Sequence, residues 1–171
     1  YSIPTQEMMG LTINASVDYD PAADVGSTTA GGVNATTVNG KAYVLKVAHE
    51  SGLEVGAGQE IIENATAKSA TSTAEDEENV TAYAKFSSGP FSIGMQEAYA
   101  NAANGAADTE ATFWAVAYTA GDFSVSYGES TTSNHSLNGS TVVERELESL
   151  QATYTMGAMT LGAALAETSN A

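Results

Sequence analysis

The stretch Phe86-Ser87-Ser88-Gly89-Pro90-Phe91-Ser92-Ile93-Gly94 decides the fold, because its pattern occurs four times in the chain. The other copies are His49-Glu50-Ser51-Gly52-Leu53-Glu54-Val55-Gly56, Tyr118-Thr119-Ala120-Gly121-Asp122-Phe123-Ser124-Val125-Ser126 and Tyr154-Thr155-Met156-Gly157-Ala158-Met159-Thr160-Leu161-Gly162. An aromatic ring closes one run of residues, a glycine supplies a turn, and a bulky apolar residue opens the next run. This combination is typical of a β-hairpin.

The spacing of the four hairpins predicts how they are connected. Their turn glycines, Gly52, Gly89, Gly121 and Gly157, recur at intervals of about 32 to 37 residues. Such a period is too long for one tight hairpin, and it fits a hairpin followed by a long loop. Short turns at one rim and long loops at the other are the layout of a transmembrane β-barrel.

Alternation of apolar and polar residues predicts nine strands and no helix. In residues 11–19, for example, Leu11, Ile13 and Val17 alternate with Thr12, Asn14 and Ser16. The nine expected strands cover about 11–19, 42–50, 53–61, 80–86, 91–99, 112–118, 123–129, 143–156 and 159–167. The long connections are expected at about 20–41, 63–79, 100–110 and 130–142. The sequence therefore predicts an all-β fold, with residues 1–171 in one domain.

Composition excludes several classes of function. Twenty-one acidic residues face five basic ones, and the formal net charge is −16. No basic stripe for nucleic acid can form from these residues. The chain has no cysteine, so disulfides and thiolate metal sites are excluded. No apolar run approaches the roughly 20 residues of a transmembrane helix.

The distribution of side chains favours an antiparallel up-and-down transmembrane barrel. Large aromatic residues beside the short turns are expected to form a lipid-facing girdle: Phe86, Phe91, Tyr118, Phe123 and Tyr154. Other apolar residues expected to face outward are Leu11, Ile13, Val17, Val47, Val55, Ile93, Trp114, Val116, Val125, Leu161 and Leu165. Many apolar residues within the strands are small, which suits lipid better than an interdigitated core. The alternative is a secreted or surface-layer β-sandwich, an adhesin module that binds a partner through its long loops.

The opposite face is polar and is expected to line a water-filled pore. The predicted pore-lining residues are Asp18, Lys46, Glu54, Glu60, Tyr83, Lys85, Gln96, Arg145 and Gln151. Charged groups on a pore wall set its ion preference, and the acidic excess predicts a preference for cations. Thr12, Asn14, Ser16 and Ser126 are expected on the same face. We expect no catalytic, cofactor-binding or metal site, and the protein is not expected to be an enzyme.

The repeated hairpins, together with the opening segments Tyr1-Ser2-Ile3-Pro4-Thr5 and Met9-Gly10-Leu11-Thr12, resemble the general diffusion porins of Gram-negative bacteria. The alphaproteobacterial type of this family is the most similar. The resemblance implies an outer-membrane channel for small hydrophilic solutes and ions, built from about 16 strands and assembled as a homotrimer. Nine strands are too few for that barrel, and the chain ends in Glu167-Thr168-Ser169-Asn170-Ala171 without a terminal aromatic residue. We therefore expect an internal portion of a longer porin.

Overall fold

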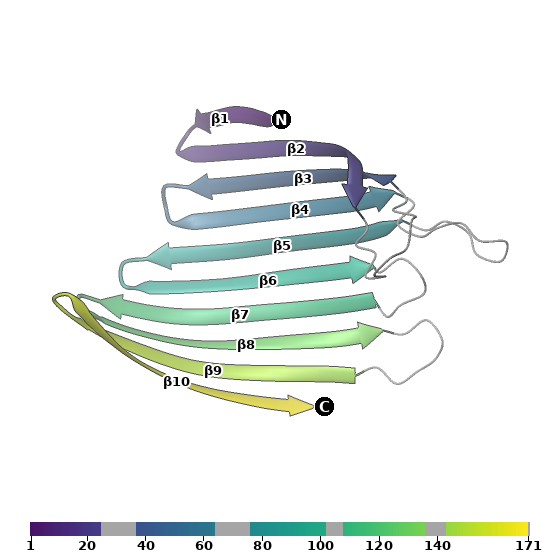
Figure 1. Cartoon of the computed structure of the whole chain (residues 1–171). Helices are drawn as coiled ribbons and strands as arrows, with labels where there is room; N and C mark the ends of the chain where they lie inside the picture. The colour runs from purple at the N-terminus through teal and green to yellow at the C-terminus, as the bar shows by residue number, and fades with distance from the viewer. Residues whose placement is uncertain (25–36, 64–75, 102–107, 136–142, 171) are drawn as a thin grey trace.

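The computed structural model describes residues 1–24, 37–63, 76–101, 108–135 and 143–170. These residues form one antiparallel sheet of ten strands, and the order in the sheet is the order in the sequence (Figure 1). The strands are β1 (Ser2–Met8), β2 (Leu11–Asp24), β3 (Thr37–His49), β4 (Leu53–Glu63), β5 (Glu77–Ser88), β6 (Phe91–Asn101), β7 (Asp108–Ala120), β8 (Phe123–His135), β9 (Val143–Met156) and β10 (Met159–Asn170). The all-β, up-and-down architecture is confirmed.

The predicted count of nine strands was wrong, because β1 precedes the nine that were expected. Its two large apolar residues, Ile3 and Met8, stand an odd number of positions apart, so the sequence shows no alternation. A shift of register between Ile3 and Gln6 compensates for this spacing and brings both residues to one face. The turn after β1 also lacks the aromatic residue that marks the other hairpins.

The strands also reach further into the predicted connections than alternation indicated. β2 continues to Asp24, β5 already begins at Glu77, and β8 runs to His135. The added residues of β5 and β8 are polar, from Glu77 to Asn79 and from Ser130 to Asn134, and β2 adds the segment Asp20-Pro21-Ala22-Ala23-Asp24. The backbone ladder therefore continues where the alternation has ended. No helix in the described part of the chain is long and apolar enough to cross a membrane.

All five hairpin turns lie at the same rim of the sheet, on the left in Figure 1. The four predicted turn glycines have positive φ angles, from 56° at Gly89 to 93° at Gly52. The fifth turn consists of Met9 and Gly10, with φ angles of 54° and 78°. Two consecutive positive φ angles are the requirement of a type I′ turn, whose twist matches that of the strands it joins.

The strand registers divide the side chains into two faces, since residues paired across an antiparallel ladder point to the same side. Val55 pairs with Ala84, and Ile93 pairs with Val116, while Glu54 pairs with Lys85. Every residue that was expected to face outward lies on the first of these faces, and every residue expected inward lies on the second. The predicted division into two faces is confirmed.

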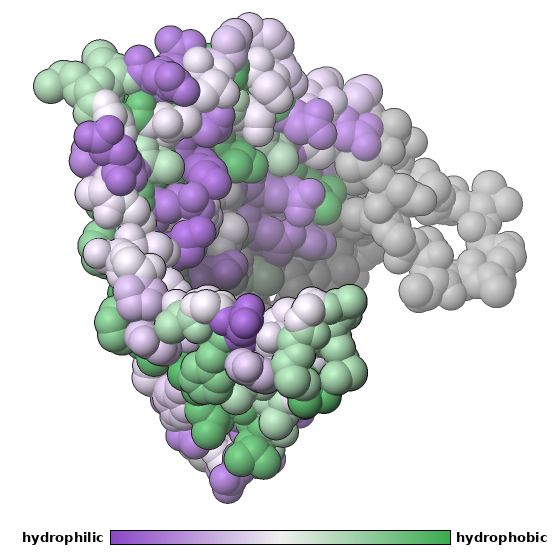
Figure 2. Space-filling model, turned by 90° about the vertical axis from the view of Figure 1, so that its left-hand side faces the viewer, coloured by the Kyte–Doolittle hydropathy of each residue, from purple (hydrophilic) through white to green (hydrophobic). Residues whose placement is uncertain are grey.

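The polar face is the hollow one. Viewed from the turn end, hydrophilic residues gather in the hollow of the curved sheet, and hydrophobic residues gather below it over β7–β10 (Figure 2). Along β4, Leu53, Val55 and Ala57 are exposed, whereas Glu54 and Gly56 between them are more shielded. We therefore call the apolar side the convex face and the polar side the concave face.

The sheet has no hydrophobic core. None of the large side chains in the described segments is fully buried. On the convex face Ile93 is 53% exposed, Phe91 63% and Leu165 72%. A contiguous apolar surface of this kind needs a nonaqueous or protein partner to be stable.

Candidate pore wall and membrane belt

The hairpins are staggered along the sheet in one direction. Leu53 at the start of β4 pairs with Phe86, but β5 continues two residues further to its turn. Likewise Phe91 pairs with Tyr118 while β7 continues to Ala120, and Phe123 pairs with Tyr154 while β9 continues to Met156. The turns therefore step by two residues for every two strands, as Figure 1 shows from β4 to β10.

This stagger defines a strand tilt. A stagger of one residue per strand equals the shear number divided by the strand number in an eight-stranded barrel with a shear number of eight. The strands of such a barrel tilt by about 36°. Transmembrane barrels have tilts of about 35–45°. The stagger between β4 and β10 thus corresponds to a tilt within the range of transmembrane barrels.

The apolar part of the convex face follows the same slant. One hydrogen-bonded row crosses it, passing from apolar to acidic residues as it goes from β4 to β10: Val55, Ala84, Met95, Trp114, Glu129, Glu148 and Glu167. On β8 to β10 the apolar residues lie nearer to the turns, for example Val125, Ala152 and Ala163. A band that slants across the rows of paired residues becomes parallel to the membrane plane once the strands are tilted in a barrel. We call this band the apolar belt.

The height of the belt is compatible with that of a membrane interior. On β5 it runs from Phe86 to Val80 and is bounded by Ser88 and Glu78. The belt itself spans about 20 Å along the strand, and its polar bounds are about 34 Å apart. At a tilt of about 36° these lengths correspond to about 16 Å and about 27 Å along the barrel axis, and the apolar band of outer-membrane barrels, about 25 Å tall, lies between them.

The five predicted girdle residues all lie on the convex face, and their positions follow the stagger of the turns from β5 to β9. Phe86 and Phe91 belong to one hairpin, Tyr118 and Phe123 to the next, and Tyr154 to the last. The rings of Phe91 and Tyr118 are neighbours, with centroids 4.9 Å apart. The aromatic residues therefore border the belt on its turn side. Contact of these rings with lipid stays a prediction.

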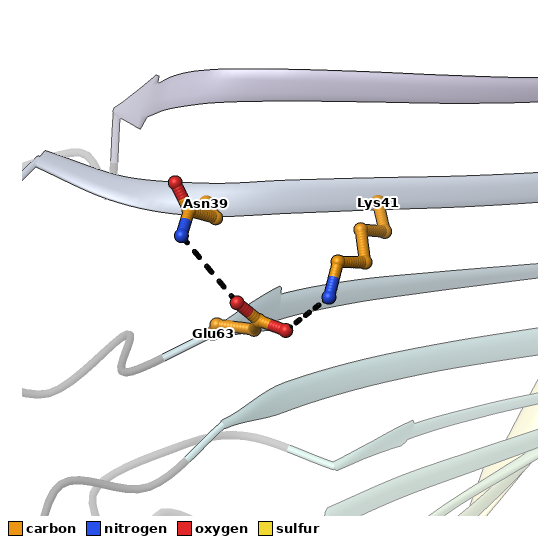
Figure 3. Close-up of polar contacts among 3 residues, drawn as sticks. All are labelled: Asn39, Lys41 and Glu63. Atoms are coloured by element: carbon orange, nitrogen blue, oxygen red, sulfur yellow. Dashed lines mark hydrogen bonds and ion pairs between the residues drawn. The ribbon is translucent and has the colours of Figure 1, made fainter.

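Carboxylates border the belt on its loop side, and sequence reasoning missed them. Beyond the belt the convex face carries Glu63, Glu78, Asp108, Glu110, Glu129, Glu144, Glu146, Glu148 and Glu167, and Glu97 lies opposite Ala82 of the belt. Oxygens of Glu129, Glu146 and Glu148 lie within 4.8 Å of one another. At the same margin Glu63 pairs with Lys41 and accepts a 3.5 Å hydrogen bond from Asn39 (Figure 3). Much of the chain's acidity therefore lies outside the hollow.

All nine residues that were predicted to line a pore lie on the concave face. They come from six strands, and Gly, Ser, Thr and Asn fill most positions between them. Glu7, Asp20 and Glu77 share this face and were not predicted. The sheet thus has one polar wall, and its role as a pore lining stays a prediction.

One cluster on this wall joins four of the predicted residues. Glu54 accepts a hydrogen bond of 2.9 Å from the Tyr83 hydroxyl. Its carboxylate also pairs with Lys46 Nζ at 3.0 Å and with Lys85 Nζ at 3.6 Å. Elsewhere on the wall Asn79 donates to Glu60 at 3.2 Å, and Gln96 donates to Thr81 at 3.1 Å. The cluster around Glu54 lies near the turn end of the hollow.

No protein-family model matches the chain, and no curated protein has significant similarity to it.

Proposed function

We propose that this chain forms the wall of an outer-membrane porin, a passive diffusion channel for small hydrophilic solutes and ions. One observation carries the proposal: an apolar belt crosses the convex face of a sheet whose concave face is polar. Lipid around the belt would cover the exposed apolar side chains, and water would fill the hollow. The resemblance of the hairpins to general diffusion porins supports the same assignment.

The single layer of the sheet favours a barrel over the adhesin module. A β-sandwich packs two sheets about 10 Å apart and buries the side chains between them. The described strands form one sheet, and none of their large apolar side chains is fully buried. In the proposed barrel the outer edge of β1 and the outer edge of β10 each pair with another strand of the barrel, because unpaired backbone groups are costly in lipid. The 16-stranded, trimeric assembly of the resembled family belongs to this proposal.

The concave face supports a preference for cations. Its charged residues, where the side chains are described, are the acidic Glu7, Asp18, Asp20, Glu54, Glu60 and Glu77 and the basic Lys46, Lys85 and Arg145. A wall with this acidic excess attracts cations into the channel. The excess on the wall is smaller than the net charge of the chain suggests, since many carboxylates lie on the convex face.

Planar bilayer recording tests the proposal. The full-length porin to which we assign the chain, reconstituted from detergent, is expected to give stepwise increases in conductance and a cation-selective zero-current potential in a KCl gradient. The selectivity is expected to weaken as salt rises, because the screening length falls from about 30 Å at 0.01 M to about 3 Å at 1 M. Heat-denatured protein serves as the control. A folded monomer in detergent-free buffer, without any bilayer activity, would support the adhesin alternative instead.

A further inference from the structure

We propose that Lys46, Glu54 and Lys85 form a contact site for small oxyanions on the concave wall. The inference rests on the proposed channel function, and it adds a class of solute that the acidic wall would otherwise disfavour. Carboxylate and phosphate groups share the required chemistry, since ammonium groups donate charge-assisted hydrogen bonds to both.

The strand registers create the site from three neighbouring strands. Glu54 on β4 is the direct partner of Lys85 on β5, and Lys46 comes from β3. Lys46 Nζ lies 3.0 Å from Glu54 Oε2, and Lys85 Nζ lies 3.6 Å from Glu54 Oε1. Each lysine therefore pairs with a different oxygen of one carboxylate. Two positive charges and one negative charge leave the cluster with one net positive charge.

Exposure determines which of these groups a solute meets. The Glu54 side chain is 19% exposed, whereas those of Lys46 and Lys85 are 43% and 52% exposed. An ammonium group has three hydrogen-bond donors, so each lysine keeps donors for a solute while it contacts Glu54. An anion that approaches from the hollow meets the two lysines before it meets the carboxylate.

Tyr83 and Gly56 hold the carboxylate in place. The Tyr83 hydroxyl donates to Glu54 Oε1, the oxygen that also faces Lys85. The Tyr83 ring lies against Gly56, where a Cβ atom would be 2.4 Å from the ring carbon Cε1. Glycine is therefore needed for this ring position, and Tyr83 is a positioning residue. A site held in this way loses less conformational entropy when a solute binds.

The surroundings keep the cluster distinct from the rest of the wall. On its outer sides, Lys46 pairs with Asn14 and Lys85 pairs with Gly94, neither of which carries a charge. Asp18 and Glu60 lie further toward the loop end, and Glu7 lies two strands away from Lys46 on β1. The outer partners of the two lysines are thus uncharged, while Glu7 and Glu50 line a pocket together with Ala48, the residue paired with Glu54.

Current block by inorganic phosphate, with acetate in a parallel arm, tests the site in the reconstituted full-length porin. In Glu54→Gln, phosphate is expected to bind about fivefold more tightly, the effect of one unit charge at about 4 Å in water. The zero-current potential in a KCl gradient is also expected to shift toward the equilibrium potential of chloride. In the double variant Lys46→Gln/Lys85→Gln, block by phosphate is expected to disappear. The matched control is Glu60→Gln, which removes another concave-face carboxylate and is expected to change phosphate affinity by less than about twofold.

The outcomes separate this inference from the proposed function. Conductance in the wild type with equal phosphate affinity in all variants would overturn the site and leave the channel standing. Absence of conductance in the wild type would overturn the channel itself. If Glu54→Gln does not insert, the double lysine variant decides. Acetate is expected to rank the variants in the same order, and a response to phosphate alone contradicts the oxyanion class.

Discussion

Replacement of Ile93 by arginine is expected to lower the free energy of unfolding in lipid bilayers by about 1–3 kcal/mol, between the costs at the interface and at the midplane. Ile93 lies in the apolar belt on β6, between Phe91 and Met95 and opposite Phe86, and it is 53% exposed. In the proposed arrangement its side chain contacts lipid, and a charged group there loses its hydration. Denaturant titration of the protein in vesicles measures the change.

Ser92→Arg is the matched control, because Ser92 is the next residue on the same strand and lies on the concave face. Its arginine would extend into water, so we expect less than about 0.5 kcal/mol of destabilisation. If the convex face were in water, Ile93→Arg would be as harmless as Ser92→Arg. Equal stabilities of the two variants would therefore contradict the membrane belt.

Replacement of Gly52 by alanine is expected to lower the free energy of unfolding by about 3 kcal/mol, which combines backbone strain with a broken contact between strands. Gly52 has a φ of 93°, and a Cβ there would lie 1.9 Å from the Ser87 carbonyl oxygen. The Gly52 carbonyl also accepts a 3.0 Å hydrogen bond from the Ser87 amide. Separating the two backbones to make room for the methyl group would break this bond.

Gly121→Ala is the control for the φ angle alone. Gly121 has a φ of 57°, and a Cβ there would meet no atom within 4 Å. Only the left-handed strain remains, and it costs about 1 kcal/mol. The midpoints of urea-induced unfolding compare the two variants. Equal losses of stability would show that Gly52 does not approach Ser87 closely.

Alternation predicted the fold wherever one face of a strand is apolar. In β4, Leu53, Val55 and Ala57 alternate with Glu54, Gly56 and Gly58, and both the strand and its facing were predicted from this pattern. The pattern failed in β1, where a bulge breaks the spacing of Ile3 and Met8. It also failed at the loop-side ends of the strands, since hydrogen bonding between backbones continues where apolar and polar residues no longer alternate.

The functional residues were predicted in part for the same reason. The facing of all nine proposed pore-lining residues follows from the rule that successive residues of a strand point to opposite faces. Parity would also have placed Glu148 on the convex face, because it lies two residues from Leu150. The contact of Glu54 with both Lys46 and Lys85 needs the registers of three strands. Those registers depend on turn lengths that alternation does not determine.

Fluorescence quenching of Trp114 tests the central claim most directly, because Trp114 is the only tryptophan of the chain. It lies on the convex face of β7 within the belt, beside Tyr127 at a ring-centroid distance of 5.5 Å. Phe113, the preceding residue, lies on the concave face. A variant with Trp114→Phe and Phe113→Trp therefore moves the fluorophore to the other face by one residue.

In vesicles of lipids brominated along their acyl chains, Trp114 is expected to be strongly quenched, and aqueous acrylamide is expected to have little effect. The tryptophan at position 113 is expected to show the reverse order, with strong quenching by acrylamide and weak quenching by brominated lipid. This exchange of quenchers follows only if lipid covers the convex face and water fills the hollow. Strong acrylamide quenching of Trp114 in folded, vesicle-bound protein, without quenching by brominated lipid, would contradict the account.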